Sequence, residues 1–180
     1  MIDVVIGVGS NYDAENYLPK AVAHLAQRFG GLTLSKVYQS SALVKENVNR
    51  SAHIFSCDSE HYYLNMAVYF QVNTDEFPAA CVIEYLKEIE RKLDRRIDSK
   101  EKKRITIDLD LLLYGDDPVV IGARLYPAKD ELNHSFVLAP LADIVGHKRY
   151  AYGEECYAQY WQALDKNHLP LKIVNLNFAD

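Results

Sequence analysis

The sequence predicts an α+β fold of the ferredoxin-like type, an antiparallel sheet with helices in the order β-α-β-β-α-β. Three observations predict it. Runs rich in β-branched and other apolar residues occur four times, at 3–9, 32–41, 62–72 and 105–114. Two stretches with the apolar spacing of amphipathic helices separate them, at 14–31 and 74–93. No repeat or linker divides the chain, so we expect one domain over residues 1–180.

The first half of the chain supplies three strands and one helix. Residues 3–9, DVVIGVG, are typical of a buried strand that ends in glycine. The helix of 14–31 repeats its apolar residues every three or four positions, at Leu18, Val22, Leu25 and Phe29. Residues 32–41 alternate as a strand, and 62–72 are rich in aromatic residues and Val. Between them, 42–61 show no sustained period, which predicts a long loop that is a functional lid or disordered.

The second half continues the pattern and then adds to it. The helix of 74–93 has Val82, Leu86, Ile89 and Leu93 on one face. The apolar strand of 105–114 follows, and both helices are expected on the same face of the sheet. Residues 118–127 predict a short strand or hairpin, and 135–145 a loop that enters a short helix. In the C-terminal extension, 146–180, the tyrosine-rich stretch 150–164 predicts an added packing helix.

Composition excludes several classes of protein. The net charge of −5 argues against a general nucleic-acid binder. The N-terminus lacks the basic and long apolar stretches of a signal peptide, and no apolar run reaches the roughly 18 residues of a membrane span. Three scattered cysteines, Cys57, Cys81 and Cys156, fit reduced thiols and offer no zinc pattern. We therefore expect a cytoplasmic protein that works on small molecules, with neither a nucleic acid nor a membrane as partner. We expect a monomer, with a dimer as the alternative.

Two aspartates interrupt the most apolar strand. Asp108 and Asp110 share one face of it, with Cα atoms about 6.6 Å apart. Ile107, Leu109, Leu111 and Leu113 are expected on the opposite face, in the helix-covered core. Because burial of a lone carboxylate is costly, the pair predicts a positive partner, and hard cations such as Mg²⁺ prefer such oxygen ligands. The alternative is a solvated strand face that carries two charges.

A basic segment leads into this strand. Residues 91–104 contain eight Lys and Arg against three Asp and Glu, a local charge of +5 in a chain of −5. Metal-bound carboxylates beside arginines and lysines are what a polyphosphate requires, because the cations bind the remaining phosphate oxygens. A solvated charged loop is the alternative interpretation.

Two further motifs indicate a pocket. GVGSN, 7–11, lacks the third glycine of a dinucleotide fingerprint because Tyr12 stands there, and no P-loop motif occurs. These glycines predict a tight turn, or a backbone that a flat ligand can approach. On the strand 62–72, Tyr63 and Asn65 share a face. Asn65 can bond to backbone, or it can bind the edge of a heterocycle while Tyr63 or Phe136 stacks on the ring.

Taken together, these motifs resemble those of the 6-hydroxymethyl-7,8-dihydropterin pyrophosphokinase family. The resemblance covers about residues 2–145 and is carried by GSN at 9–11, YQSS at 38–41, YLN at 63–65, IE at 89–90, DLDLLLYG at 108–115 and FVLAPLADI at 136–144. It implies a ferredoxin-like fold and the transfer of pyrophosphate from ATP to the pterin's hydroxymethyl group, with release of AMP and two Mg²⁺ ions.

The resemblance also implies roles for individual residues. The metal ligands are Asp108 and Asp110. The pterin pocket comprises Ser40, Leu43, Tyr63, Asn65 and Phe136. The nucleotide side comprises Glu90, Lys103, Leu111 and His134. The catalytic cations are Arg95, Arg96 and Arg104.

Several family positions hold other residues here. Lys102 stands where the family has the tryptophan that covers the pterin. Ile105 stands where the family has an arginine before the threonine, and Arg104 lies one position earlier. Where the family has a second loop arginine, this chain has Ile97. It also has Ala128 in place of a histidine, His134 in place of an arginine and Ser41 in place of a proline. These replacements predict a slower enzyme unless neighbouring cations compensate. Two alternatives remain: a diverged paralogue with another acceptor, and a non-catalytic protein that binds pterin or nucleotide.

Overall fold

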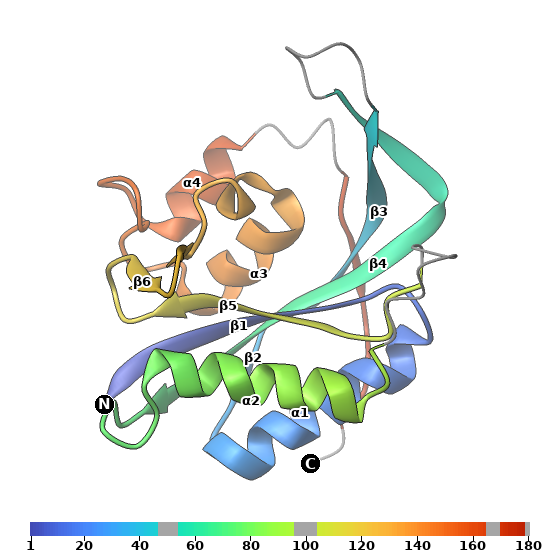
Figure 1. Cartoon of the computed structure of the whole chain (residues 1–180). Coiled ribbons are helices and arrows are strands. Elements are labelled where there is room, and N and C mark those ends of the chain that lie inside the picture. Colours follow the sequence, from blue (N-terminus) through green and yellow to red (C-terminus); the bar gives the residue numbers. More distant parts are fainter. Residues whose placement is uncertain (47–53, 96–103, 165–169, 179–180) are drawn as a thin grey trace.

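The computed structural model describes residues 1–46, 54–95, 104–164 and 170–178; of 42–46 and 54–61 it describes only the backbone. Its main sheet has the strand order β5-β1-β4-β3-β8, and β2 pairs with β4 (Figure 1). The strands are β1 (Ile2–Ser10), β2 (Thr33–Leu34), β3 (Val37–Glu46), β4 (Ile54–Val72), β5 (Asp108–Tyr114) and β8 (Lys172–Val174). All these pairings are antiparallel, and the order β5-β1-β4-β3 confirms the predicted ferredoxin-like fold.

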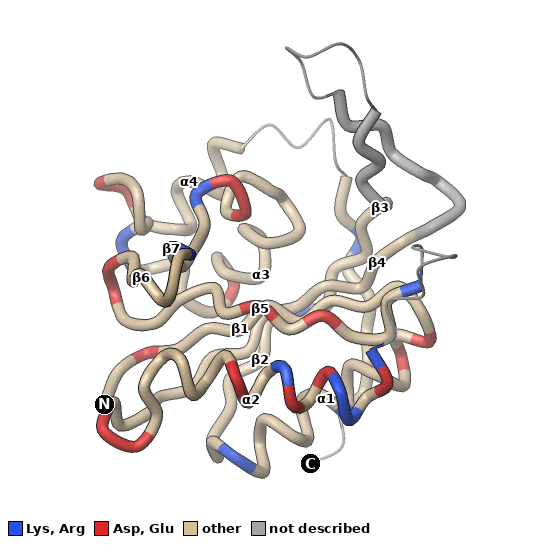
Figure 2. The backbone as a smooth tube through the Cα atoms, viewed as in Figure 1, with Lys and Arg blue, Asp and Glu red and all other residues tan. Residues whose placement is uncertain are grey.

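Two helices cover one face of this sheet, as predicted (Figure 1). They are α1 (Ala14–Phe29) and α2 (Ala79–Lys92). Their apolar faces meet those of the central strands in one core cluster, where Leu18, Leu25, Val82, Ile6 and Phe70 are all buried. The opposite side of α2 is polar, and Figure 2 shows acidic and basic positions alternating along it. The 3.6-residue spacing in the sequence therefore located both helices and their inner faces.

The other face of the sheet is covered as well. Here lie a single 3₁₀ turn, η1 (Glu131–Asn133), and two helices, α3 (Ser135–Val145) and α4 (Tyr157–Ala163). A second core cluster joins Leu138, Leu141 and Tyr157 to Val5 and Leu112 of the sheet. The prediction of a short helix in 135–145 is confirmed. The packing helix predicted for 150–164 forms only from Tyr157 onward. The molecule thus has three layers, with the sheet in the middle.

The predicted loop of 42–61 is wrong for most of its length. The backbone of β3 continues to Glu46, and β4 begins at Ile54, so the two strands extend as one long hairpin. Residues 47–53 lie outside the described chain. The pairing shifts register between Ser41 and Ala42, which interrupts the alternation that sequence analysis relies on. The strand predicted for 32–41 is also two strands, because β2 ends at Leu34 and β3 begins at Val37.

The strand that carries the two aspartates starts later than predicted, and its side-chain alternation changes near its C-terminal end. It begins at Asp108, not at residue 105. Near its other end the pairing with β1 shifts between Val5 and Ile6, since Val5 faces Leu113 and Ile6 faces Leu111. This bulge reverses the alternation. Leu113 consequently lies in the second core cluster, and its predicted place in the helix-covered core is wrong.

The remaining strands lie at the margins of the fold. Residues 118–127 form the predicted hairpin, as β6 (Val119–Ile121) and β7 (Arg124–Tyr126). Strand β8, which no pattern in the sequence predicted, extends the main sheet beside β3. In the described parts of the chain, no helix combines the length and the apolar character that crossing a membrane requires.

Candidate active site

A cavity of about 280 Å³ opens between the sheet and α3. The sheet contributes Asp108 and Asp110 from β5, Tyr63 and Asn65 from β4, and Ser40 from β3. Helix α3 contributes Phe136. Three strands and a helix thus bring together six residues that were selected from four separate segments of the sequence.

Two glycines of β1 form the part of the cavity between the acids and the amide. In the sheet, Gly9 faces Asp108 on one side and Asn65 on the other, and Gly7 faces Asp110. A Cβ at Gly9 would lie 3.1 Å from Asn65 Oδ1, and one at Gly7 would lie 3.2 Å from Leu112 Cδ1. Both contacts are tight, so the glycines keep this surface flat. The tight turn predicted for these glycines is wrong, because β1 continues through them to Ser10.

The amide of Asn65 is oriented by a neighbouring hydroxyl. Its Nδ2 donates to Ser40 Oγ at 3.0 Å, and Ser40 is itself buried. This bond uses one of the two amide protons. Tyr63, which faces Ser40 across the strands, also lines the cavity, and burial followed by the nearby Asp108 charge raises the pKa of its hydroxyl. On the opposite wall, the rings of Phe136 and His134 stack at 5.0 Å between centroids.

The pKa values of the Asp108 and Asp110 carboxyl groups are raised. Burial and then the neighbouring Asp110 raise the pKa of Asp108 to about 6. Burial and then Glu131 raise the pKa of Asp110. Raised values mean that the protein alone does not balance the two negative charges. A divalent cation would do so, and Mg²⁺ commonly uses only one or two carboxylates and takes its other ligands from water and phosphate.

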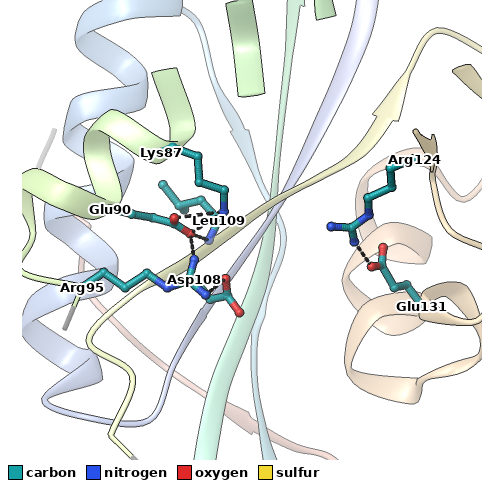
Figure 3. A network of polar contacts seen from close by, with 7 residues as sticks. All are labelled: Lys87, Glu90, Arg95, Asp108, Leu109, Arg124 and Glu131. Atoms are coloured by element: carbon teal, nitrogen blue, oxygen red, sulfur yellow. Dashed lines mark hydrogen bonds and ion pairs between the residues drawn. The ribbon is translucent and has the colours of Figure 1, made fainter. Parts of the chain in front are cut away.

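One cation of the protein already contacts this pair. Arg95, just after α2, lies between Glu90 and Asp108 (Figure 3). Its Nη2 lies 2.9 Å from Asp108 Oδ1, and its Nη1 binds Glu90 Oε1. Glu90 is buried and also accepts bonds from Lys87 Nζ and from the backbone N–H of Leu109, each at 2.9 Å. Burial alone would raise the pKa of Glu90, but these three donors together hold it below its usual value.

A second ion pair lies on the Asp110 side. Arg124 of β7 binds Glu131 of η1, and Figure 3 shows the pair across β5 from Glu90. Glu131 raises the pKa of Asp110 and Arg124 lowers it, so the two partners of this ion pair act on Asp110 in opposite directions. Sequence analysis selected neither residue.

Not all residues selected from the sequence reach the cavity. Among the described residues, Glu90 and Leu111 do not line it; Glu90 faces the layer between α2 and β5, and Leu111 packs in the helix-covered core. Arg104 lies over the ring of Tyr12 at 5.2 Å, next to the cavity wall formed by Ile105. Burial lowers the pKa of His134, which lies behind Phe136. Arg96, Lys102, Lys103, Ile97 and the side chain of Leu43 lie outside the described part of the structure.

Sequence analysis also missed a contact at the edge of the site. Ile105 lines the cavity, and its backbone N–H and C=O are both bonded by Asn11, 94 positions away. The GSN motif drew attention to Asn11 only as part of a family pattern. No local signal in the sequence connects it to Ile105.

Comparison with known proteins agrees with this geometry. The family model described as 7,8-dihydro-6-hydroxymethylpterin-pyrophosphokinase (HPPK) matches residues 5–146. The chain is also 33% identical over 140 residues to the 2-amino-4-hydroxy-6-hydroxymethyldihydropteridine pyrophosphokinase of Bacillus subtilis (strain 168), which covers 77% of this chain and 75% of that protein. The chain belongs to the HPPK family. Members of this family transfer pyrophosphate from ATP to hydroxymethyldihydropterin in folate biosynthesis, so the predicted family and enzyme class are confirmed.

Solved structures show the same fold at low identity. A Plasmodium falciparum HPPK-DHPS, crystallised as wild type with SDX-DHP, is 11% identical with a TM-score of 0.55, over 94% of this chain and 47% of that one. An HPPK-DHPS in complex with substrates is 12% identical with a TM-score of 0.60, over 91% and 45%. The present chain spans somewhat less than half the length of these structures.

Proposed function

We propose that this HPPK-family chain transfers pyrophosphate from ATP to the hydroxymethyl group of 6-hydroxymethyl-7,8-dihydropterin and releases AMP. In that reaction the acceptor oxygen attacks the β-phosphorus of ATP. The bond from the β-phosphorus to the oxygen bridging to the α-phosphate breaks, and the hydroxyl proton leaves to solvent. One observation carries the proposal: the carboxylate pair Asp108 and Asp110 and the amide of Asn65 line the same cavity.

The flat part of the cavity fits the pterin ring. With no side chain at Gly7 and Gly9, a planar ring can lie against β1. The second amide proton and the carbonyl of Asn65 would bind the polar edge of the pterin, and Phe136 and Tyr63 would contact its faces. Ser40 holds the amide in this orientation.

The carboxylate end fits a metal-bound triphosphate. Asp108 and Asp110 would hold Mg²⁺, two ions by the family resemblance, and their raised pKa values reflect the charge that such ions balance. Bound Mg²⁺ neutralises phosphate oxygens and so stabilises the charge that develops during transfer. Arg95, which contacts Asp108, and Arg104, which precedes the cavity residue Ile105, would contact the remaining oxygens. Arg96 and Lys103 belong to the same proposal through their family positions, as do Glu90, Leu111 and His134 on the nucleotide side and Leu43 on the pterin side.

Release of AMP tests this function directly. We expect the protein to form AMP from ATP only when both Mg²⁺ and the hydroxymethyl dihydropterin are present. Asp110→Ala should abolish it, whereas Asp117→Ala, an exposed aspartate just beyond the same strand, should not. AMP formation that requires a different acceptor would support the diverged paralogue. Binding of pterin or nucleotide with no AMP from any acceptor would support the non-catalytic alternative.

We also propose that residues 1–180 act as one domain and as a monomer in the cytoplasm. The two core clusters share the same sheet, which supports the single domain. Size-exclusion chromatography with light scattering tests the oligomeric state.

A further inference from the structure

Asn11 makes a reciprocal contact with the residue that closes the cavity wall. Its backbone N–H donates to the carbonyl of Ile105 at 3.0 Å, and its side-chain Oδ1 accepts from the N–H of Ile105 at 2.6 Å. Antiparallel strands exchange such a pair of bonds between two backbones. Here the asparagine side chain replaces one backbone carbonyl, which short polar side chains are able to do.

The contact lies where the ladder between β1 and β5 has ended. The last paired residues are Gly9 and Asp108, so the described ladder between β1 and β5 does not extend to residue 105. The fully buried Ser10 adds support, because its hydroxyl lies 3.3 Å from the carbonyl oxygen of Ile105 and 3.2 Å from that of Tyr12. Its single proton can serve one of these oxygens at a time.

This contact fixes the backbone from which two side chains project, Arg104 and Ile105. Ile105 is held in the cavity wall. Arg104, the preceding residue, is held with its guanidinium 5.2 Å from the centre of the Tyr12 ring, within range of a cation–π interaction. Tyr12 itself follows Asn11 directly. The short segment after β1, Asn11 and Tyr12, therefore sets the positions of Arg104 and Ile105, which lie shortly before β5.

We propose that Asn11 is a positioning residue for pyrophosphoryl transfer, acting through the backbone of Ile105 to place Arg104 beside the phosphates and Ile105 against the acceptor. The inference rests on the proposed function. It gives Arg104 a defined place although the arginine expected by resemblance at position 105 is isoleucine. A shift of about 1 Å in a positioned group can cost about 10²-fold in rate, so a clamp on this segment has a kinetic effect.

Steady-state kinetics of AMP release, with ATP and pterin varied separately, test the proposal. Asn11→Ala should lower kcat by about 10- to 100-fold and raise the pterin KM, because Arg104 and Ile105 lose their position. Asn11→Asp keeps an oxygen that accepts from the Ile105 N–H and should recover most of kcat. Asn16→Ala is the matched control. The side chain of Asn16 donates to the exposed Asp13 at the start of α1, so this variant should match the wild type.

A double-mutant cycle separates positioning from a general structural role. If Asn11 acts through Arg104, then Asn11→Ala should lower kcat much less in an Arg104→Gln background than in the wild type. Hydrogen exchange of the Ile105 amide gives a second readout that needs no activity. Protection of this amide should be lost in Asn11→Ala while the amides of β1 and β4 keep theirs.

Each result has a definite meaning. An unchanged kcat in Asn11→Ala, or an equal loss of kcat in the wild-type and Arg104→Gln backgrounds, would overturn the inference. The proposed function would still stand in either case, because the wild-type protein forms AMP. Unchanged protection of the Ile105 amide would overturn the clamp itself. A wild-type protein that forms no AMP would overturn the proposed function, and the kinetic inference with it.

Discussion

Arg95 Nη2 lies 2.9 Å from Asp108 Oδ1, and the same guanidinium binds the buried Glu90. One cation of the protein therefore joins the interior of the fold to a carboxylate of the cavity. In the reaction that we propose, this arginine is next to the triphosphate, and the same carboxylate holds a metal. Arg95 and a bound metal ion would thus share Asp108 as a partner.

This shared partner predicts opposite effects of one substitution. Arg95→Gln should lower kcat for AMP release by about 10²- to 10³-fold, the usual effect of losing one charge stabiliser. It should also tighten Mn²⁺ binding in the absence of nucleotide, because a competitor for Asp108 is gone. Calorimetry with Mn²⁺ and the AMP assay measure the two effects. Lys92→Gln, which removes a cation from an exposed pair on α2, is the control, and weaker Mn²⁺ binding in Arg95→Gln would contradict the prediction.

Gly9 predicts a selective effect on the acceptor. In Gly9→Ala the new Cβ would lie 3.1 Å from Asn65 Oδ1, so the amide must move by a few tenths of an ångström from the position in which it binds Ser40. We expect the pterin KM to rise about tenfold or more, consistent with one lost polar contact, while the KM for ATP changes little. Gly31→Ala, where a Cβ meets nothing within 4 Å, is the control. Equal pterin KM values in the two variants would show that the flat surface is not needed.

Glu90 predicts a large effect on stability. It is 3% exposed and receives bonds from Arg95, Lys87 and the Leu109 N–H. Glu90→Ala removes the acceptor that these three donors share and should lower the free energy of unfolding by about 3 kcal/mol, the lower end for a broken buried ion pair. Urea denaturation measures it. Glu88→Ala is the control, because Glu88 forms an exposed ion pair on the same helix, and it should leave the urea midpoint unchanged. A similar loss of stability in both variants would contradict the role of Glu90.

Asp3 predicts the direction of an acid effect on stability. Burial would raise its pKa, but hydrogen bonds from Lys148, Gln71 and Tyr69 outweigh this and lower it from 3.8 to about 2. A carboxyl whose folded pKa is depressed stabilises the fold above its unfolded pKa. That stabilisation is lost as the pH falls from 3.8 towards 2.

Melting temperatures measured from pH 6 to pH 2 check this effect. In Lys148→Met, the pKa of Asp3 moves back towards its ordinary value, so the contribution of Asp3 is smaller and Tm should fall less over the acid range. Lys172→Met, an exposed position on β8, is the control. Parallel curves for the wild type and Lys148→Met would contradict the role of the Asp3–Lys148 pair.

The sequence predicted those parts of the fold and site that depend on local periodicity. Successive side chains of a strand point to opposite faces of the sheet. Asp108 and Asp110 therefore had to share a face, as did Tyr63 and Asn65. Helical spacing likewise located the faces of α1 and α2 that meet the sheet.

The parts that it missed depend on partners far away in the chain. The hairpin of β3 and β4 continues past a register shift between Ser41 and Ala42. Beyond that point apolar and polar residues do not alternate in the sequence, so only the pairing of the two strands shows that they continue. The bulge that turns Leu113 to the second core is a property of two strands together. Asn11 and Ile105 are 94 positions apart, and a single sequence gives no measure of such contacts.

The most direct test of this account is a crystal of the protein with Mn²⁺, a non-hydrolysable ATP analogue and the pterin. The account predicts anomalous density for Mn²⁺ bonded to both Asp108 and Asp110, with the analogue's phosphates on its far side. Ordered nucleotide with no anomalous density at these carboxylates, and Arg95 still bound to Asp108, would contradict it.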